Sequence, residues 1–273
     1  MTKDMQALVL LALAGTVVAG LTLWRMGLMP HGEEPLVFAP EMSAPAHAPA
    51  VSTEVRVEYP MDALPLGAAL SAQALGRALT ELLGGAGAAA ILQLEDFPRR
   101  FVATVDNLGR PHAPALAWPV NPTPDRFTVN AASGGSVIAL DNAARYTPFV
   151  LLAEAIDSRR AVDLYVRAYP LLQRAYEELG FPGRYFNDRL VAVIDLLLAT
   201  PQTEYPVPLR LTEVKGPIAS LRPWVRYEFA DPALESLCAG QKILVRVGPV
   251  NQRRLKAKLA EIRAELVARA PKR

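Results

Sequence analysis

An uncharged stretch near the amino terminus constrains this chain of 273 residues more than any other feature. Residues 7–24, ALVLLALAGTVVAGLTLW, contain no charged side chain and end beside Arg25. As a helix they extend roughly 27 Å, about the thickness of the hydrocarbon core of a bilayer. A cleavable signal peptide has a shorter apolar region and a nearby cleavage site, whereas the Ala-x-Ala of Ala46 to Ala48 lies too far downstream. We therefore predict that residues 1–26 are a retained membrane anchor.

The stretch after this apolar run has the composition of a spacer. Its prolines recur too closely for a regular helix or sheet, at Pro30, Pro35, Pro40, Pro45 and Pro49. We predict a disordered linker over residues 27–60 and a folded domain over residues 61–273. Because the tail before the apolar run is very short, we expect the amino terminus inside the cell and the domain outside the cytoplasm.

The composition favours a folded domain and excludes several classes of site. Hydrophobic residues make up 51% of the chain, enough for a substantial core. Residues 61–273 carry 26 basic and 21 acidic side chains, a mild excess that does not indicate nucleic-acid binding. With Cys238 as the single cysteine and His112 as the single histidine of this domain, an intrachain disulfide and a cysteine- or histidine-rich metal site are excluded. We expect neither a metal nor a cofactor.

The apolar pattern of the domain predicts mainly helices. Leucines recur at helical spacing from residue 75 to 82, up to the glycine pair at 84–85. A second helix is predicted over about 90–108, with a break at Pro98. Helical spacing returns over residues 142–200. Interruptions within this stretch are predicted at Pro148, Pro170 and the GFPG turn at 180–183.

Short strands are predicted between the helices. RFTVN and SVIAL flank the turn AASGG, and VPLRLTEV and WVRYEF follow later. DPALESL has helical spacing, while KILVRV after it fits either a strand or a helix. The predicted fold class is α+β, mainly α, with helical hairpins and a few short strands behind the transmembrane helix and the disordered linker.

Two of the predicted helical segments repeat one pattern. RRFVATVDNLG at 99–109 and DRLVAVIDLLL at 188–198 both run from Arg to Asp, with Leu two residues later. In each copy the Arg and the Asp are six residues apart and flank an apolar stripe from opposite sides, so they are not neighbours on their own helix. The pattern indicates two similar helical hairpins, not two acid/base pairs. An internal duplication is a further hypothesis.

Asp106 is at a position where a carboxylate is not expected on a solvent-exposed helix face. It lies just before the predicted helix stop at Gly109, where the helix dipole disfavours a carboxylate. A cation from another helix would compensate for that position. If the two hairpins pack together, the expected pairs are Asp106 with Arg189 or Asp195 with Arg100.

The richest polar cluster is GFPGRYFNDRL at 180–190. Asn187 is expected to cap a helix beginning at Asp188, whose carboxylate in the first turn complements the dipole. Arg184 and Arg189 beside that helix end are the alternative, a site for an anionic group. The candidate binding residues are Arg184, Tyr185, Asn187, Asp188, Arg189, Arg100, Asp106 and Asp195.

The end of the chain is basic but also amphipathic. Residues 251–273 hold eight basic side chains and two acids. Their apolar residues recur at spacings of 4, 3 and 4, which predicts a helix over 249–267 that docks on the domain, with Asn251 as a plausible cap. The stripe consists of Leu255, Leu259, Ile262 and Leu266.

Several long phrases of the domain resemble an uncharacterised family of bacterial envelope proteins, in which a domain of unknown function follows one membrane span. The phrases are AYEELGFPGRYFNDRLVAVIDLLL, VATVDNL, NAARYTPFV, YEFADPALE and AGQKILVRVGPVNQRRLKAKL. The resemblance covers roughly residues 60–267. It implies a single-pass inner-membrane anchor with a periplasmic domain, and it implies no activity.

Anchor, spacer and missing catalytic signatures together favour a non-catalytic binding or scaffolding module of the periplasm. We expect its partners to be the inner membrane, through residues 7–24, and an envelope protein or a cell-wall polymer. The alternative is a carboxylate-based enzyme acting on cell-wall glycan, which needs two Asp or Glu side chains across a cleft. The candidates for that chemistry are Glu95, Asp96, Asp106, Glu177 and Asp188.

Overall fold

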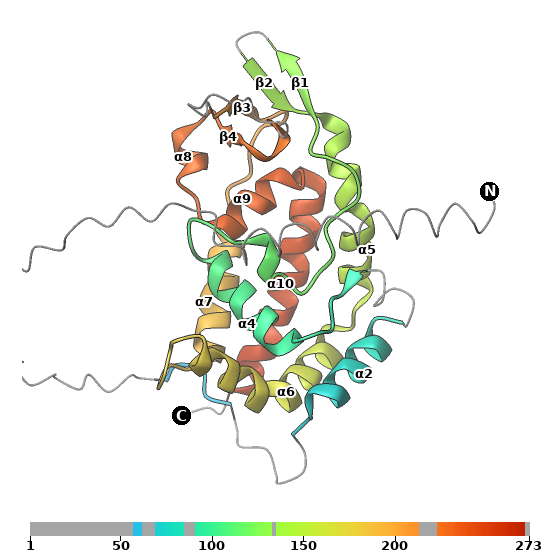
Figure 1. The fold of residues 1–273 in the computed structure, drawn as a ribbon, viewed down its shortest axis with the longest axis vertical. Helices are drawn as coiled ribbons and strands as arrows, with labels where there is room; N and C mark the ends of the chain where they lie inside the picture. Colours follow the sequence, from blue (N-terminus) through green and yellow to red (C-terminus); the bar gives the residue numbers. More distant parts are fainter. Residues whose placement is uncertain (1–56, 62–68, 85–90, 133–134, 213–222, 271–273) are drawn as a thin grey trace, which may run out of the picture. The chain divides into compact units, whose positions relative to one another are not determined.

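The computed structural model describes residues 57–61, 69–84, 91–132, 135–212 and 223–270. All of them belong to one compact unit, Thr53–Arg273 (Figure 1). The predicted anchor lies outside the described residues, as does the predicted linker except for its last residues, so both stay predictions. In the described part of the chain, no helix combines the length and the apolar character needed to cross a membrane.

Helices dominate the unit, and a small sheet accompanies them. The α-helices are α2 (Ala72–Leu82), α4 (Phe97–Leu108), α5 (Thr147–Ala155), α6 (Ser158–Glu178), α7 (Phe186–Leu198), α8 (Pro232–Glu235), α9 (Ala239–Arg246) and α10 (Pro249–Arg269). The strands are β1 (Val129–Ala132), β2 (Gly135–Ile138), β3 (Pro208–Leu211) and β4 (Tyr227–Phe229). Short 3₁₀ turns occur at Ala115–Ala117, Leu140–Tyr146 and Pro223–Val225.

Local sequence signals set where several helices begin. Ser71, Asp157 and Asp231 cap α2, α6 and α8, because each side chain accepts a backbone N–H of the first turn at 2.8–3.2 Å. Pro98 and Pro148 occupy the first turns of α4 and α5, where a missing N–H costs no helical bond. The segment predicted as a helix over about 90–108 is therefore regular helix from Phe97 onward.

The helix interruption predicted at Pro170 is wrong. Pro170 lies inside α6, which runs without a break from Ser158 to Glu178. Pro170 is exposed, whereas Tyr169 and Leu172 beside it are buried, so packing of the inner face carries the helix past the missing N–H. The segment KILVRV, which the sequence left open, belongs to the helix α9.

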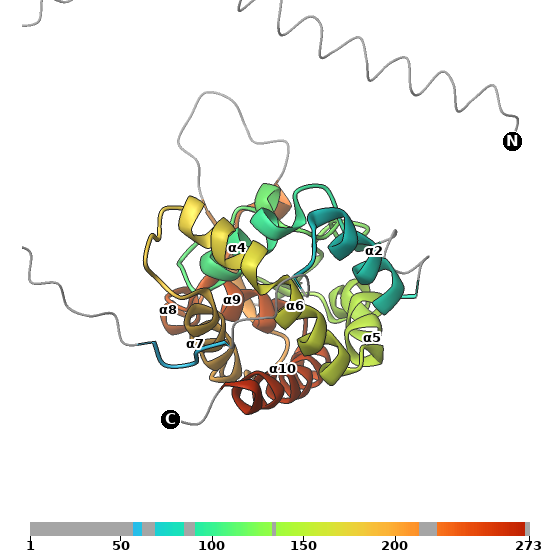
Figure 2. The same cartoon turned by 90° about the horizontal axis from the view of Figure 1, so that it is seen from below.

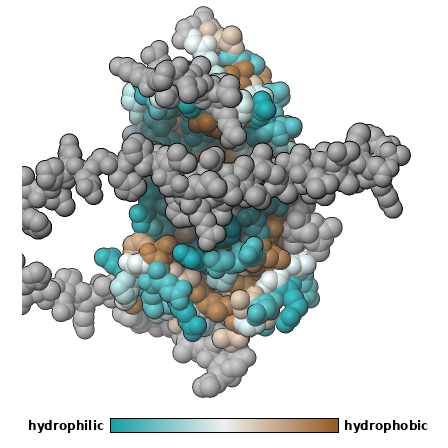
Figure 3. All heavy atoms as spheres, in the orientation of Figure 1, coloured by the Kyte–Doolittle hydropathy of each residue, from teal (hydrophilic) through white to brown (hydrophobic). Residues whose placement is uncertain are grey.

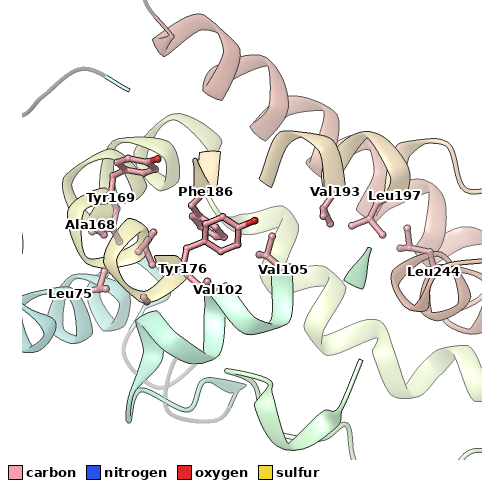
Figure 4. Packing of buried hydrophobic residues seen from close by; sticks show 13 residues of the cluster. Leu75, Val102, Val105, Ala168, Tyr169, Tyr176, Phe186, Val193, Leu197 and Leu244 are labelled. Carbon is pink, nitrogen blue, oxygen red and sulfur yellow. The ribbon is translucent and has the colours of Figure 1, made fainter. Parts of the chain in front are cut away.

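The main core lies where the helices α4 and α10 pack against the helices α6 and α7. In Figure 2, α4 and α10 lie on opposite sides with α6 and α7 between them, and both α6 and α7 contact both outer helices. Side chains from α4, α6, α7 and α9 contribute to one buried cluster (Figure 4). Val102 and Phe186 at its centre are completely inaccessible to solvent. Burial of such side chains contributes about 1.5–3 kcal/mol each to the free energy of unfolding.

The sheet forms a second, smaller core at one end of the unit, beside α8 and α9 (Figure 1). Its four strands are antiparallel in the order β1-β2-β3-β4, with Val129 opposite Ile138 and Leu209 opposite Phe229. Ile138, Leu209 and Phe229 are buried against Val245 of α9. The predicted fold class, mainly α with a few short strands, is confirmed.

A half-buried ion pair links α8, α9 and the sheet. Lys242 donates from Nζ to Oε1 of Glu235 at 2.9 Å, and Oε2 of Glu235 accepts the backbone N–H of Phe229 at 2.9 Å. Burial alone would raise the pKa of Glu235, but the bonds from Lys242 and Phe229 outweigh it and hold the pKa below its usual value.

The apolar stripe of the last helix packs on the domain, as predicted. Leu266 is 1% exposed, and the other three members of the stripe pack against the buried clusters. The predicted cap at Asn251 is wrong, because α10 begins at Pro249, directly after Gly248. The Asn251 side chain instead donates from inside the first turn to the carbonyl of Ala143 at 2.9 Å.

Gly240 provides a test of how closely the helices pack. A Cβ atom at Gly240 would lie 2.5 Å from Cδ2 of Leu197 and 3.1 Å from the carbonyl oxygen of Leu108. We predict that Gly240→Ala lowers the free energy of unfolding by about 1–3 kcal/mol. The matched control is Gly76→Ala in α2, where a Cβ meets nothing within 4 Å, and which should raise it by about 0.5–1 kcal/mol. Urea unfolding followed by circular dichroism measures both, and equal effects would contradict the close packing.

Candidate functional site

The predicted cation partner of Asp106 is present. Asp106 lies near the carboxyl end of α4 and is only 4% exposed. Arg189 of α7 donates from Nε to Oδ1 of Asp106 at 2.9 Å and from Nη2 to its backbone carbonyl at 2.7 Å. Arg110 adds a second ion pair, with Nη2 2.6 Å from Oδ2. The predicted pair of Asp106 and Arg189 is therefore confirmed.

Close approach of Arg189 depends on Gly109, which ends α4. A Cβ atom at Gly109 would lie 2.9 Å from Nη2 of Arg189 and 3.3 Å from Cζ. Glycine thus lets the guanidinium cover the end of the helix, where it neutralises a carboxylate that the dipole disfavours and occupies a carbonyl without an intrahelical partner. Arg110 is half exposed and also lies over the ring of Phe181, at 5.8 Å from the ring centroid.

The second predicted pair, Asp195 with Arg100, is wrong. Arg100 donates to the carbonyl of Leu116 at 2.9 Å. Asp195 forms its ion pair with Arg263 of α10, whose Nη2 lies 3.0 Å from Oδ2. The physical reason is the way the helices meet. α10 packs against α7 and brings Arg263 to Asp195, whereas Arg100 of α4 lies beside Leu116.

The helix after the GFPG turn begins earlier than predicted. α7 starts at Phe186 and has no side-chain cap, so the predicted capping by Asn187 is wrong. Asn187 is completely buried in the first turn, where its Oδ1 accepts the hydroxyl of Tyr165 at 3.0 Å and its Nδ2 donates to the carbonyl of Tyr59 at 2.9 Å. Asp188 lies in the first turn of α7, as predicted.

Three candidate residues at this helix end bind the last residues of the predicted linker. Asp188 accepts the backbone N–H of Glu58 at 3.0 Å and that of Tyr59 at 2.7 Å. The hydroxyl of Tyr185 accepts the backbone N–H of Met61 at 2.7 Å. We call Tyr185, Asn187 and Asp188 the linker clamp, because together they hold the backbone of residues 58–61.

The two arginines of the alternative anion site, Arg184 and Arg189, have different environments. Arg189 is committed to Asp106, and the side chain of Arg184 is exposed. The backbone carbonyl of Arg184 accepts the side-chain amide of Gln173 at 2.8 Å, while Oε1 of Gln173 accepts the N–H of Phe186 at 2.9 Å. The structure therefore gives Arg184 and Arg189 no shared position around an anion.

A tyrosine cluster behind the linker clamp was not found from the sequence. The ring of Tyr169 lies 5.8 Å from that of Tyr165 and 5.4 Å from that of Tyr185, measured between centroids. Burial raises the pKa of Tyr165 and of Tyr169 well above the usual range. Both phenols therefore stay protonated and act as hydrogen-bond donors. The signal in the sequence was the spacing of four residues between Tyr165 and Tyr169, which places them on one helix face.

The carboxylates named for glycan hydrolysis are mostly engaged by the protein itself. Asp106 binds two arginines, and Asp188 binds the linker backbone. Glu177 accepts the side-chain amide of Gln173 at 2.8 Å. Asp96 precedes α4 in a left-handed backbone conformation, and Glu95 beside it is exposed. Among the described residues, no group of three or more His, Cys, Asp and Glu side chains is placed to hold a metal ion.

Comparison with known proteins gives one match. The sequence profile of a family described as "Protein of unknown function (DUF3014)" matches residues 97–263. The matched stretch begins with α4 and includes the Asp106 and Arg189 pair and the linker clamp. No curated protein and no solved structure matches the chain.

The linker clamp can be tested by proteolysis of the full chain. Asp188→Ala removes both bonds to the backbone of Glu58 and Tyr59, and a charge-assisted hydrogen bond contributes about 1.5–3 kcal/mol. We predict that a protease specific for glutamate then cleaves at Glu58 roughly tenfold faster or more. Asp195→Ala removes a surface pair on the same helix and is the matched control. Equal cleavage rates in the two variants would rule out the clamp.

Proposed function

We propose that this chain, which belongs to the DUF3014 family of proteins of unknown function, is a membrane-anchored module that binds or scaffolds a partner in the periplasm without catalysing a reaction. In this proposal residues 7–24 cross the inner membrane once, and residues 27–60 tether the module to it. The partner is an envelope protein or a cell-wall polymer. The length of the apolar run and the prolines after it support the anchor and the tether.

The linker clamp is the observation that carries this proposal. Residues 58–61 are held by side chains of α7, so the tether joins the module at a defined point on a helix of the core. A spacer with a fixed attachment point positions a folded module relative to its anchor. The candidate polar side chains around this point contact the protein itself, which favours a positioning role over a catalytic one.

Membrane topology and partner binding can be measured in the same cells. Alkaline phosphatase fused after Arg273 should be active, because we propose that the carboxyl terminus faces the periplasm. Crosslinking of the full chain in intact cells should recover an envelope protein or a cell-wall fragment. The control Leu10→Arg with Val17→Arg places two charges in the apolar run, at about 2.5–3.5 kcal/mol each, and should abolish membrane retention.

Two results would contradict the proposal. Release of a shortened, mature protein into the soluble periplasm would show that the apolar run is a signal peptide. Recovery of neither an envelope protein nor cell-wall material from correctly anchored protein would remove the binding or scaffolding role.

A further inference from the structure

A half-open cavity of about 330 Å³ lies between the helices of the core. Its lining side chains come from α2, α4, α6, α7 and α10, and all of them are apolar except the phenol of Tyr165. Leu79, Phe101, Leu164 and Val193 each form part of the wall. The hydroxyl of Tyr165 is already bonded to Asn187, so the wall offers an apolar surface with no free polar group to attract water.

The cavity is too large to be an ordinary packing defect. Protein interiors are packed as densely as organic crystals, and voids larger than a water molecule are few. An empty void weakens a fold in proportion to its volume. The volume of about 330 Å³ is roughly twice that of an engineered apolar cavity that stays dry and binds benzene. It therefore suits an apolar ligand of roughly a dozen carbon atoms.

The cavity approaches the surface between α2 and α4. Leu79, Leu82, Phe97 and Phe101 on this side of the lining are only half buried. Figure 3 shows hydrophobic residues at the surface between these two helices, bordered by hydrophilic ones. These half-buried side chains mark the side of the cavity nearest the surface.

A polar pocket of about 310 Å³ adjoins the cavity. The two spaces share Leu82 and Leu164 in their linings, so they lie side by side. The polar side chains of the pocket are Glu81 of α2 and Arg160, Asp163 and Arg167 of α6.

The pocket contains two arginines that form no ion pair in the described part of the chain. Arg160 and Arg167 are seven residues apart on α6, so they lie on one face. Asp163 between them forms its ion pair with Arg269 of α10. Within the described ranges, neither Arg160 nor Arg167 forms an ion pair, although Glu81 lines the same pocket and the carboxylate of Asp157 lies near Arg160. Both guanidinium groups therefore remain available to an anionic group.

We propose that the cavity binds the acyl chain of a single-chain amphiphile, whose anionic head group lies between Arg160 and Arg167. The apolar volume accommodates one chain, and the two arginines of the adjoining polar pocket bind a carboxylate or phosphate at the end of that chain. The site goes beyond the proposed scaffolding role and does not rest on the anchor, because every residue that forms it lies in the described helices.

Photolabelling of the full chain in lipid nanodiscs tests this site. The probe is dodecanoate with a diazirine at its chain end, and labelled peptides are mapped by mass spectrometry. We expect labels on α4, α6 and α7, and about tenfold weaker competition by dodecyltrimethylammonium than by unlabelled dodecanoate. If a lysophosphatidylglycerol with a 12-carbon chain competes better than dodecanoate, the natural head group is a phosphate. The reverse order identifies a free fatty acid, and either order supports the site.

Variants separate the cavity from the head-group pocket. Ala168→Phe and Val193→Phe fill the cavity from two helices, and each should reduce labelling at least fivefold while circular dichroism shows a folded protein. Arg160→Gln with Arg167→Gln should weaken competition by dodecanoate about fivefold, the scale of exposed ion pairs. The matched control is Arg77→Gln with Arg174→Gln, which removes two charges outside the pocket and should change nothing.

Three results would overturn the proposal. The first is labelling that is unchanged in both cavity-filled variants. The second is equal competition by the cationic and anionic amphiphiles. The third is a crosslink from residues 7–24 into α4 or α7, which would show that a segment of the chain itself fills the cavity.

Discussion

A buried carboxylate at the end of α4 is the constraint on which the arrangement of the other helices depends. Asp106 is 4% exposed and lies where the helix dipole already concentrates negative charge. A carboxylate in that position is tolerated only with a close cation, because an uncompensated buried charge destabilises a fold by several kcal/mol. α7 supplies that cation with Arg189, and Gly109 provides the space for it.

The same helix links three parts of the molecule. Its first turn holds the linker backbone through Asn187 and Asp188, and the next residue, Arg189, binds the end of α4. Further along, Val193 and Leu197 line the apolar cavity. Fixing α7 against α4 therefore also fixes the backbone of residues 58–61 and one wall of the cavity. In the function that we propose, the contact between α4 and α7 determines both how the module is positioned and where it binds a ligand.

The sequence predicted mainly those features that depend on the spacing of neighbouring residues. Helical spacing and prolines predicted most helices and the fold class, whereas the two predicted caps, Asn187 and Asn251, are wrong. The pairing of Asp106 with Arg189 was predictable because a carboxylate at a helix end needs a cation. The pairing of Asp195 with Arg100 failed because the cation for Asp195 comes from α10, outside the two similar segments. Asn187 was taken for a cap because the residues that bind it are far away in the sequence. The cavity depends on how five helices fill a common space, which no single segment encodes.

The most direct test of this account is the coupling energy between Asp106 and Arg189, from a double-mutant cycle. Asp106→Ala, Arg189→Met and the double variant are compared with the unchanged chain by urea unfolding, and a parallel cycle replaces Arg110. We predict a coupling of about 2–3 kcal/mol for the buried pair and about 1 kcal/mol or less for the half-exposed Arg110. A coupling below about 0.5 kcal/mol between Asp106 and Arg189, within the scatter of independent sites, would contradict the central role of this pair.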